Sequence, residues 1–294
     1  MSGTQICVQG ACEVTPSSCW VLPTTCGPNG DDNRCQTELV KGGTFNRSND
    51  PMYPATVSDF YLDRFEITVG RFRAFVEAYP IGSKPKAGDG VHPKIPGSGW
   101  DTGWPLYADA NALKTAIKCD NYTWTDVPAF NENLPMDCLT WYDVFAFCAW
   151  DGGRLPTEAE WNYAAAGGNE QRKYPWGPTL DLARAVYGCL GNGNPDCVFT
   201  DIRLVGSKSP QGDAKWGHAD MAGNLDEHVF DSFPDPYPMP CNDCGVLADL
   251  TKAVGRGGSW YSMDFANLET SNRGGFNKTV RFEFLGGRCA RDKL

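Results

Sequence analysis

Apolar side chains recur at helical spacing in three short segments of the chain, and this pattern predicts three short helices. The residue before each segment is a threonine, whose hydroxyl can accept a hydrogen bond from a free backbone N–H group. Proline or glycine ends each segment. The predicted helices are residues 69–79 after Thr68, residues 141–150 after Thr140, and residues 158–166 after Thr157.

Outside these helices the pattern predicts short strands and long loops. Residues 81–135 show no periodicity and include the turn-rich sequence PGSGWDTGWP. The 33 glycines and 21 prolines indicate many turns, and the 10 tryptophans can anchor those turns against a core. We therefore expect an α+β fold with little regular secondary structure.

The beginning of the chain differs from the rest. Five cysteines lie within the first 35 residues, with too few large apolar side chains around them to form a core. We expect a Cys-rich, disulfide-stapled N-terminal tail at residues 1–37 and one larger domain at residues 38–294. The sequence leaves open the pairing of the five tail cysteines, which are Cys7, Cys12, Cys19, Cys26 and Cys35.

The net charge of the chain disfavours two classes of binding partner. The 294 residues carry a formal net charge of −10 and contain no cluster of lysine and arginine. Because phosphate groups bind to concentrated positive charge, nucleic acid and anionic membranes are disfavoured as partners. No apolar run is long enough to predict membrane insertion.

Thirteen cysteines indicate an oxidising compartment, because a reducing cytosol rarely supports so many disulfides. No four of them have the spacing of a zinc site. We therefore expect an extracytoplasmic protein that is periplasmic, bound at the cell surface or secreted. No apolar targeting segment follows Met1, so we expect that the signal segment is not present in this sequence. The odd number leaves one cysteine free, or paired with another chain or with a cysteine outside this sequence.

Two cysteine pairs are close together in the sequence. Cys189 and Cys197 bracket the turn-forming sequence GNGNPD, a loop that a disulfide can close. Cys241 and Cys244 form a CxxC sequence that four prolines precede, where a thioredoxin-like redox motif needs a strand that runs into a helix. We therefore expect disulfides at both places and give a redox role of the CxxC sequence less weight.

Several longer motifs together resemble the formylglycine-generating enzyme family, also called the sulfatase-modifying factor family. They include GGRLPTEAEWNYAAAGG at 152–168, DMAGNLDEH at 220–228, GRGGSW at 255–260 and GGRCARD at 286–292. The motifs follow the family's order over roughly residues 39–292. The resemblance implies one compact domain related to the C-type lectin fold, with bound calcium and structural disulfides.

Members of this family that are enzymes oxidise a sulfatase cysteine to formylglycine with copper and oxygen, and two cysteines hold the metal. The resemblance places Ser262 and Asn267 at these two positions. Cuprous ion prefers thiolate ligands, and a hydroxyl or an amide is a poor substitute. We therefore expect no bound copper and no copper-dependent cysteine oxidation.

The resemblance also implies a disulfide between Cys148 and Cys289. A second family disulfide would use the positions of Ala165 and Asn272, so both of its halves are missing. Cys119 and Cys138 remain as a further local pair.

The family's calcium site maps onto DMAGNLDE. The resemblance implies ligands from the side chains of Asp220 and Glu227 and from the carbonyl groups of Gly223 and Leu225, and oxygen ligands suit calcium. The alternative is a turn whose acids are simply solvated. A second family site has Val186 where a side-chain ligand is expected, which disfavours that site.

Polar side chains are expected to gather at the pocket next to GRGGSW, and two classes of function remain open. The first is an exported, calcium-bound module that binds a peptide, glycan or protein ligand. The alternative is a divergent enzyme, an oxidoreductase or a protein-modifying enzyme, that uses other pocket residues or another metal. No GxSxG nucleophile elbow supports a hydrolase, and a three-histidine iron site would require His92, a residue expected at the surface, to meet His218 and His228. The pocket candidates are Asp226, His228, Ser259, Trp260, Ser262, Asn267 and Arg273.

Overall fold

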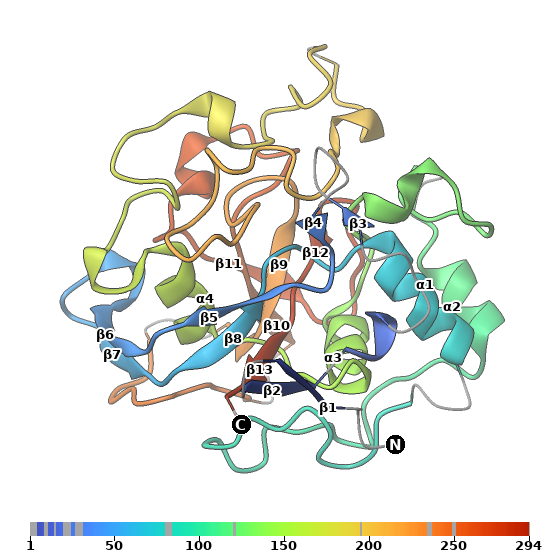
Figure 1. Cartoon of the computed structure of the whole chain (residues 1–294), viewed down its shortest axis with the longest axis horizontal. Helices are drawn as coiled ribbons and strands as arrows, with labels where there is room; N and C mark the ends of the chain where they lie inside the picture. Colours follow the sequence, from blue (N-terminus) through green and yellow to red (C-terminus); the bar gives the residue numbers. More distant parts are fainter. Residues whose placement is uncertain are drawn as a thin grey trace.

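The computed structural model shows an α+β fold with short elements joined by long loops (Figure 1). It describes residues 5–8, 11–14, 16–19, 25–26, 32–79, 84–119, 122–194, 196–233, 237–248 and 251–293. The helices are α1 (Val69–Ala78), α2 (Ala110–Ala116), α3 (Trp141–Trp150) and α4 (Glu158–Ala165). The predicted fold class is therefore confirmed.

Two sheets form the centre of the described chain. The larger has the strand order β11 (Gly274–Asn277), β10 (Lys252–Arg256), β9 (Asp226–Ser232) and β12 (Leu285–Gly286), of which only β12 and β9 pair in parallel. The smaller has the order β13 (Ala290–Asp292), β8 (Phe60–Asp63) and β5 (Thr37–Val40). Three two-stranded pairs complete the set: β1 (Gln5–Val8) with β2 (Ala11–Val14), β3 (Thr25–Cys26) with β4 (Asp32–Asn33), and β6 (Gly43–Asn46) with β7 (Pro54–Val57).

The three helices predicted from the sequence are confirmed, and their caps explain where they begin. The hydroxyl of Thr68 accepts a hydrogen bond from Arg71 N at the start of α1. Complete capping boxes begin α3, at Thr140, and α4, at Thr157. Figure 1 shows α1, α2 and α3 on one side of the sheets and α4 on the other.

The prediction of an element-free stretch at residues 81–135 is wrong. This stretch contains α2 and a short 3₁₀ helix at Phe130–Asn133. Asp109 caps α2 by accepting a hydrogen bond from Ala112 N at 2.9 Å, but Leu113 is the one buried residue in this helix. A helix with one buried side chain leaves no periodic pattern in the sequence, so the periodicity criterion misses it.

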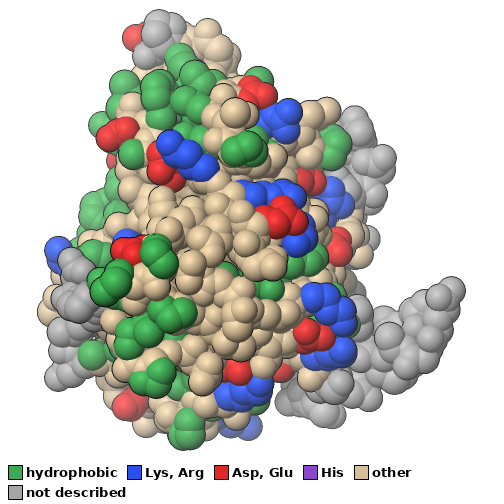
Figure 2. Space-filling model, turned by 90° about the vertical axis from the view of Figure 1, so that its left-hand side faces the viewer, with side chains coloured by type: hydrophobic (Ala, Val, Ile, Leu, Met, Phe, Trp, Pro, Cys, Tyr) green, Lys and Arg blue, Asp and Glu red, His purple; other side chains and the backbone are tan. Residues whose placement is uncertain are grey.

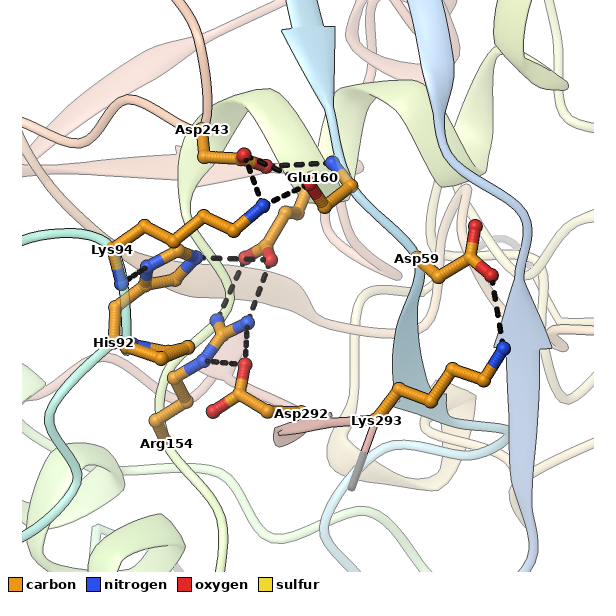
Figure 3. Close-up of a pocket in the computed structure, with 10 residues that line it drawn as sticks. Asp59, His92, Lys94, Arg154, Glu160, Asp243, Asp292 and Lys293 are labelled. Atoms are coloured by element: carbon orange, nitrogen blue, oxygen red, sulfur yellow. Dashed lines mark hydrogen bonds and ion pairs between the residues drawn. The ribbon is translucent and has the colours of Figure 1, made fainter.

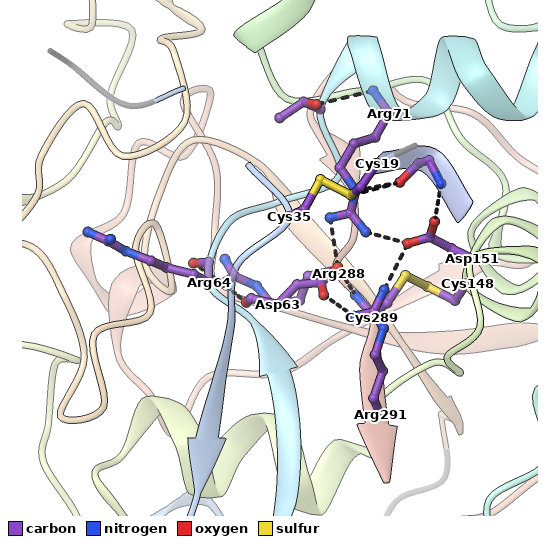
Figure 4. A network of polar contacts seen from close by, with 12 residues as sticks. Cys19, Cys35, Asp63, Arg64, Arg71, Cys148, Asp151, Arg288, Cys289 and Arg291 are labelled. Atoms are coloured by element: carbon purple, nitrogen blue, oxygen red, sulfur yellow. Dashed lines mark hydrogen bonds and ion pairs between the residues drawn. A yellow bond between two sulfur atoms is a disulfide. The ribbon is translucent and has the colours of Figure 1, made fainter. Parts of the chain in front are cut away.

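A buried network of arginine and aspartate side chains ties the N-terminal segment to the domain (Figure 4). Arg71 donates to Asp63 at 2.8 Å and to Asp151 at 2.6 Å, and Arg291 pairs with the same two carboxylates. Ser18, which is fully buried, donates its backbone N–H group to Asp151 at 2.7 Å and accepts from Arg71 Nε at 3.0 Å. Part of the predicted tail is therefore packed into the domain.

Five disulfides join described cysteines. Cys19 pairs with Cys35, which answers part of the pairing question in the tail. The side chains of Cys7, Cys12 and Cys26 lie outside the described residues. The other four disulfides join the expected pairs: Cys119 with Cys138, Cys148 with Cys289, Cys189 with Cys197, and Cys241 with Cys244.

Within the described residues, we find no helix that combines the length and the apolar character needed to cross a membrane. On the face shown in Figure 2, lysine and arginine side chains lie among aspartate and glutamate side chains instead of forming a basic area.

Candidate functional site

The GRGGSW sequence leaves β10 through a tight glycine turn that brings Asn267 beside Gly258. Gly257 and Gly258 both have positive φ, at 101° and 68°. A Cβ atom at Gly258 would lie 2.7 Å from the carbonyl oxygen of Asn267, so only glycine fits there. Trp260 follows with its side chain buried, and its Nε1 atom donates to the carbonyl oxygen of Glu283 at 3.0 Å.

Asp226, Ser259 and Ser262 form a small polar group at this turn. Ser259 N donates to Ser262 Oγ at 2.9 Å, and the two hydroxyl oxygens are 3.4 Å apart. Gly258 N donates to Asp226 Oδ1 at 3.1 Å. Burial raises the pKa of Asp226 to about 7, although its side chain keeps some contact with solvent. The site therefore holds one acid that titrates near neutral pH.

Two of the seven residues predicted for the pocket do not lie at the glycine turn. His228 is fully buried, and burial lowers its pKa to about 3, so the imidazole is neutral at pH 7. Arg273 pairs with Glu158 at 2.8 Å and stacks over the ring of Tyr237 at 4.1 Å. The turn therefore brings together Asp226, Ser259, Trp260, Ser262 and Asn267.

The histidines do not form a metal site. The expectation that His92 lies at the surface is wrong, because it is buried with Nε2 3.4 Å from Glu160 Oε1. His218 is also buried, and burial lowers its pKa to about 3. Across the part of the chain that the structure describes, no group of three or more His, Cys, Asp or Glu side chains is arranged to hold a metal.

Glu227 faces away from the pocket and pairs with Arg288 in the core. Arg288 Nη2 donates to Glu227 Oε1 at 2.7 Å, and Arg288 Nε donates to Oε2 at 2.8 Å. Trp161 Nε1 also donates to Oε2, at 2.9 Å. Arg288 therefore fixes a carboxylate and is not a group of the pocket.

Two more buried carboxylates, Glu66 and Asp220, lie beside this ion pair. Burial and the nearby acids Asp220 and Glu227 raise the pKa of Glu66 well above its ordinary value. Burial likewise raises the pKa of Asp220 to about 6. Three buried carboxylates therefore lie near the guanidinium group of Arg288, and burial favours the protonated forms of Glu66 and Asp220. Sequence reasoning missed Glu66 because it lies far from DMAGNLDE in the chain.

Apolar side chains surround the turn at the surface. The ring centroids of Trp260 and Tyr261 are 5.4 Å apart, and Phe199 and Phe284 extend this line of rings on either side. Tyr261 is 51% exposed and Met263 is 70% exposed. The polar group at the turn is therefore bordered by exposed apolar surface of the kind that ligand sites use.

A separate cavity of about 230 Å³ lies among charged side chains (Figure 3). Its wall is built on Arg154, which donates to Glu160 at 2.6 Å and to Asp292 at 2.8 Å. Sequence reasoning missed this cavity because distant segments supply its residues. They are Ser58, Asp59, His92, Pro93, Lys94, Arg154, Glu160, Asp243, Asp292 and Lys293.

Comparison with protein families identifies a sulfatase-modifying factor enzyme 1-like domain at residues 24–293. The chain belongs to this family. The match begins before residue 38, so it includes part of the predicted Cys-rich tail at residues 1–37.

Known relatives in the family carry different names. The inactive C-alpha-formylglycine-generating enzyme 2 of Bos taurus is 27% identical over 285 residues, covering 85% of this chain and 86% of that protein. The formylglycine-generating enzyme of Streptomyces coelicolor is 28% identical over 267 residues, covering 82% and 81%. The serine/threonine-protein kinase Pkn1 of Chlamydia trachomatis is 26% identical over 86% of this chain, but the match spans only 38% of the kinase.

Solved structures show the same fold at lower sequence identity. PvdO from Pseudomonas aeruginosa matches with a TM-score of 0.59 and 22% identity, covering 92% of this chain and 99% of that chain. Treponema denticola variable protein 1 matches with a TM-score of 0.56 and 18% identity, covering 88% and 95%.

Proposed function

We propose that this protein is an exported, calcium-bound member of its family that binds a peptide, glycan or protein ligand at the turn around Ser259, without copper-dependent cysteine oxidation. The observation that carries the proposal is the pair Ser262 and Asn267, which the family resemblance places at the positions of the copper-binding cysteines. Every cysteine whose side chain the structure describes is in a disulfide, so none of them offers a thiolate at this turn.

Exposed apolar side chains support a binding role for the same surface. Binding sites combine apolar contact area with a few polar groups that set orientation. Here Tyr261 and Met263 supply exposed area, and Asp226 and the serine pair supply the polar groups. The disulfides support export, because an oxidising compartment preserves them.

Ligand binding can be tested with immobilised peptide and glycan panels. Replacing Tyr261 and Met263 together by alanine should weaken capture of any bound probe by at least about tenfold, because it removes exposed contact area. Phe130→Ala is the matched control, since Phe130 is 73% exposed but lies on a different segment. No bound probe, or equal loss in both variants, would contradict a ligand site at this turn.

The absence of copper binding can be tested directly. Titration of the wild-type protein with Cu(I) against a chromophoric chelator should show no stoichiometric binding, and a sulfatase-type cysteine peptide should cause no oxygen consumption. Combining Ser262→Cys with Asn267→Cys should create Cu(I) affinity, because it returns two soft ligands to the site. Stoichiometric copper in the wild-type protein would overturn this part of the proposal.

Calcium binding is proposed at the carboxylates Asp220 and Glu227 with the carbonyl groups of Gly223 and Leu225. Burial and neighbouring acids raise the pKa of Glu66 and of Asp220, and a bound calcium ion would stabilise their ionised forms, which supports a cation here. Calcium should raise the melting temperature relative to a chelator, and Asp220→Asn should abolish the increase. Asp126→Asn, which changes an exposed acid, should leave it intact; the same calcium response in both variants would reject the site.

A divergent enzyme remains the second candidate, and the pKa of Asp226 favours it. An acid with a pKa of about 7 next to two serine hydroxyls suits proton transfer. Metal-supplemented turnover of a cysteine peptide that is lost in Asp226→Asn would replace the binding proposal with this one.

A further inference from the structure

The CxxC sequence at Cys241–Cys244 lies against a buried arginine, Arg47. Arg47 Nη1 is 3.7 Å from Cys244 Sγ. Within the described residues, no acidic side chain lies within ion-pair distance of Arg47, which is 2% exposed. Its guanidinium instead stacks on the ring of Tyr237 at 4.5 Å and donates to the carbonyl oxygen of Pro238 at 2.8 Å. The positive charge is therefore directed at the disulfide without being neutralised by a contacting acid.

The two sulfur atoms differ in access. Cys241 is 4% exposed, whereas Cys244 is half-buried and keeps contact with solvent. Arg47 thus contacts the sulfur of the more exposed of the two cysteines. A positive charge near a cysteine lowers its thiol pKa, as the N-terminus of a helix does in thioredoxin-like motifs. In this protein, Arg47 supplies the positive charge that a helix N-terminus supplies in thioredoxin-like motifs.

Backbone and side-chain hydrogen bonds hold this loop independently of the disulfide. Thr56 N donates to the carbonyl oxygen of Cys241 at 2.9 Å, and Asp243 N donates to the carbonyl oxygen of Thr56 at 2.8 Å. The carboxylate of Asp243 accepts from Ser58 N at 2.6 Å and from Lys94 Nζ at 2.8 Å (Figure 3). The loop can therefore keep its place when the bond between the sulfur atoms opens.

The disulfide also closes a very short loop, with a sequence separation of 3, compared with 141 for Cys148–Cys289. In the chain-entropy model, a disulfide stabilises the folded state more as the logarithm of the length of its closed loop increases. This bond therefore contributes the least stability among the described disulfides. Chain stabilisation is thus a weak reason for its presence.

We propose that Cys241–Cys244 is a redox-active disulfide that exchanges with thiols, with Cys244 as the attacked sulfur and Arg47 as the group that stabilises its thiolate. The co-reactant is a dithiol. One thiolate of the dithiol attacks Cys244 Sγ, the bond between the two cysteines breaks, and Cys241 leaves as a thiolate that takes a proton from water.

The second step completes the exchange. The second thiolate of the dithiol attacks the dithiol sulfur that is bonded to Cys244. This step closes the disulfide of the former dithiol and releases Cys244 as a thiolate beside Arg47. Two electrons pass from the dithiol to the protein disulfide, and a low-molecular-weight disulfide restores the oxidised protein. This inference is independent of the ligand site at Ser259.

Glutathione redox buffers test the proposal in the complete protein. After equilibration, free thiols are alkylated and each cysteine peptide is measured by mass spectrometry. We expect the Cys241–Cys244 pair to become reduced at a lower ratio of reduced to oxidised glutathione than Cys119–Cys138 and Cys148–Cys289. Equal or greater resistance to reduction would overturn the proposal.

Three variants separate the role of Arg47 from a general loss of charge. Arg47→Met should make the disulfide harder to reduce, shifting the midpoint by on the order of tenfold, because the Cys244 thiolate loses its cation. Lys118→Met removes a surface cation that pairs with Asp126 and contacts neither the loop nor its sulfur atoms, so its midpoint should not move. Arg47→Lys, which retains the charge, should recover part of the shift. Equal midpoints in Arg47→Met and Lys118→Met would reject the assignment of Arg47.

Discussion

Replacing Asp151 by asparagine should destabilise the protein strongly, because this carboxylate balances two buried arginines. Asp151 Oδ2 accepts from Arg71 at 2.6 Å and from Arg291 at 2.8 Å, and Oδ1 accepts from Ser18 N at 2.7 Å. In the variant, Asp63 is the one acid of this network left to face both guanidinium groups. Removing one partner of a buried ion pair costs about 3–5 kcal/mol of the free energy of unfolding.

The same network allows a graded test of whether the N-terminal segment belongs to the folded domain. Ser18→Ala removes only the hydroxyl that accepts from Arg71 Nε at 3.0 Å and leaves the backbone contact with Asp151 in place. One buried charged donor then lacks a partner, which costs about 1–3 kcal/mol. A negligible effect of Ser18→Ala would show that the segment does not pack as described.

Denaturant unfolding monitored by tryptophan fluorescence, with the disulfides intact, gives both free energies. Asp126→Asn is the matched control, because Asp126 pairs with Lys118 at the surface and its removal should cause no resolvable change. If Asp151→Asn is no more destabilised than Asp126→Asn, the arginine and aspartate network does not stabilise the fold and the reasoning is refuted.

Two other predictions concern acid stability and the glycine turn. Burial lowers the pKa of His218 and His228 to about 3, so below pH 6.5 the unfolded chain binds protons that the folded chain does not. The free energy of unfolding should therefore fall as the pH drops from 6.5 towards 3, and replacing both by glutamine should flatten this dependence; an unchanged slope would contradict buried neutral imidazoles. Gly258→Ala should destabilise the protein more than Gly97→Ala in thermal unfolding, because both have positive φ but only Gly258 has a backbone atom within 3 Å of the added Cβ. Equal losses would contradict the close approach of Asn267.

The sequence predicts well those helices whose ends are set by neighbouring residues. The caps at Thr68, Thr140 and Thr157 act within four residues of chain, so the pattern alone locates three helices. Periodicity fails for α2, where only Leu113 is buried. The position of a cap can be recognised without knowing the rest of the fold, whereas the burial of one side chain cannot.

Long-range side-chain contacts account for most of what the sequence does not predict. His92 is buried with its Nε2 atom 3.4 Å from Glu160 Oε1 on α4, and these residues are far apart in the chain. Glu66 reaches the same buried cluster as Glu227 through the packing of distant segments. Arg47 contacts Cys244 across an even longer stretch of chain. No local pattern specifies such contacts, so the sequence identifies the residue types of the candidate site but not their partners.

The register of β9 directs its neighbouring acids Asp226 and Glu227 into different environments. Successive side chains on a strand point to opposite faces, so Asp226 reaches the glycine turn while Glu227 reaches Arg288 in the core. The pairing of Glu227 with Arg256 and of Asp226 with Leu285 fixes this register from both neighbouring strands. A shift by one residue would put the acid of the ion pair into the pocket and leave Arg288 unpaired. The buried ion pair therefore stabilises the strand and also determines which carboxylate the pocket presents.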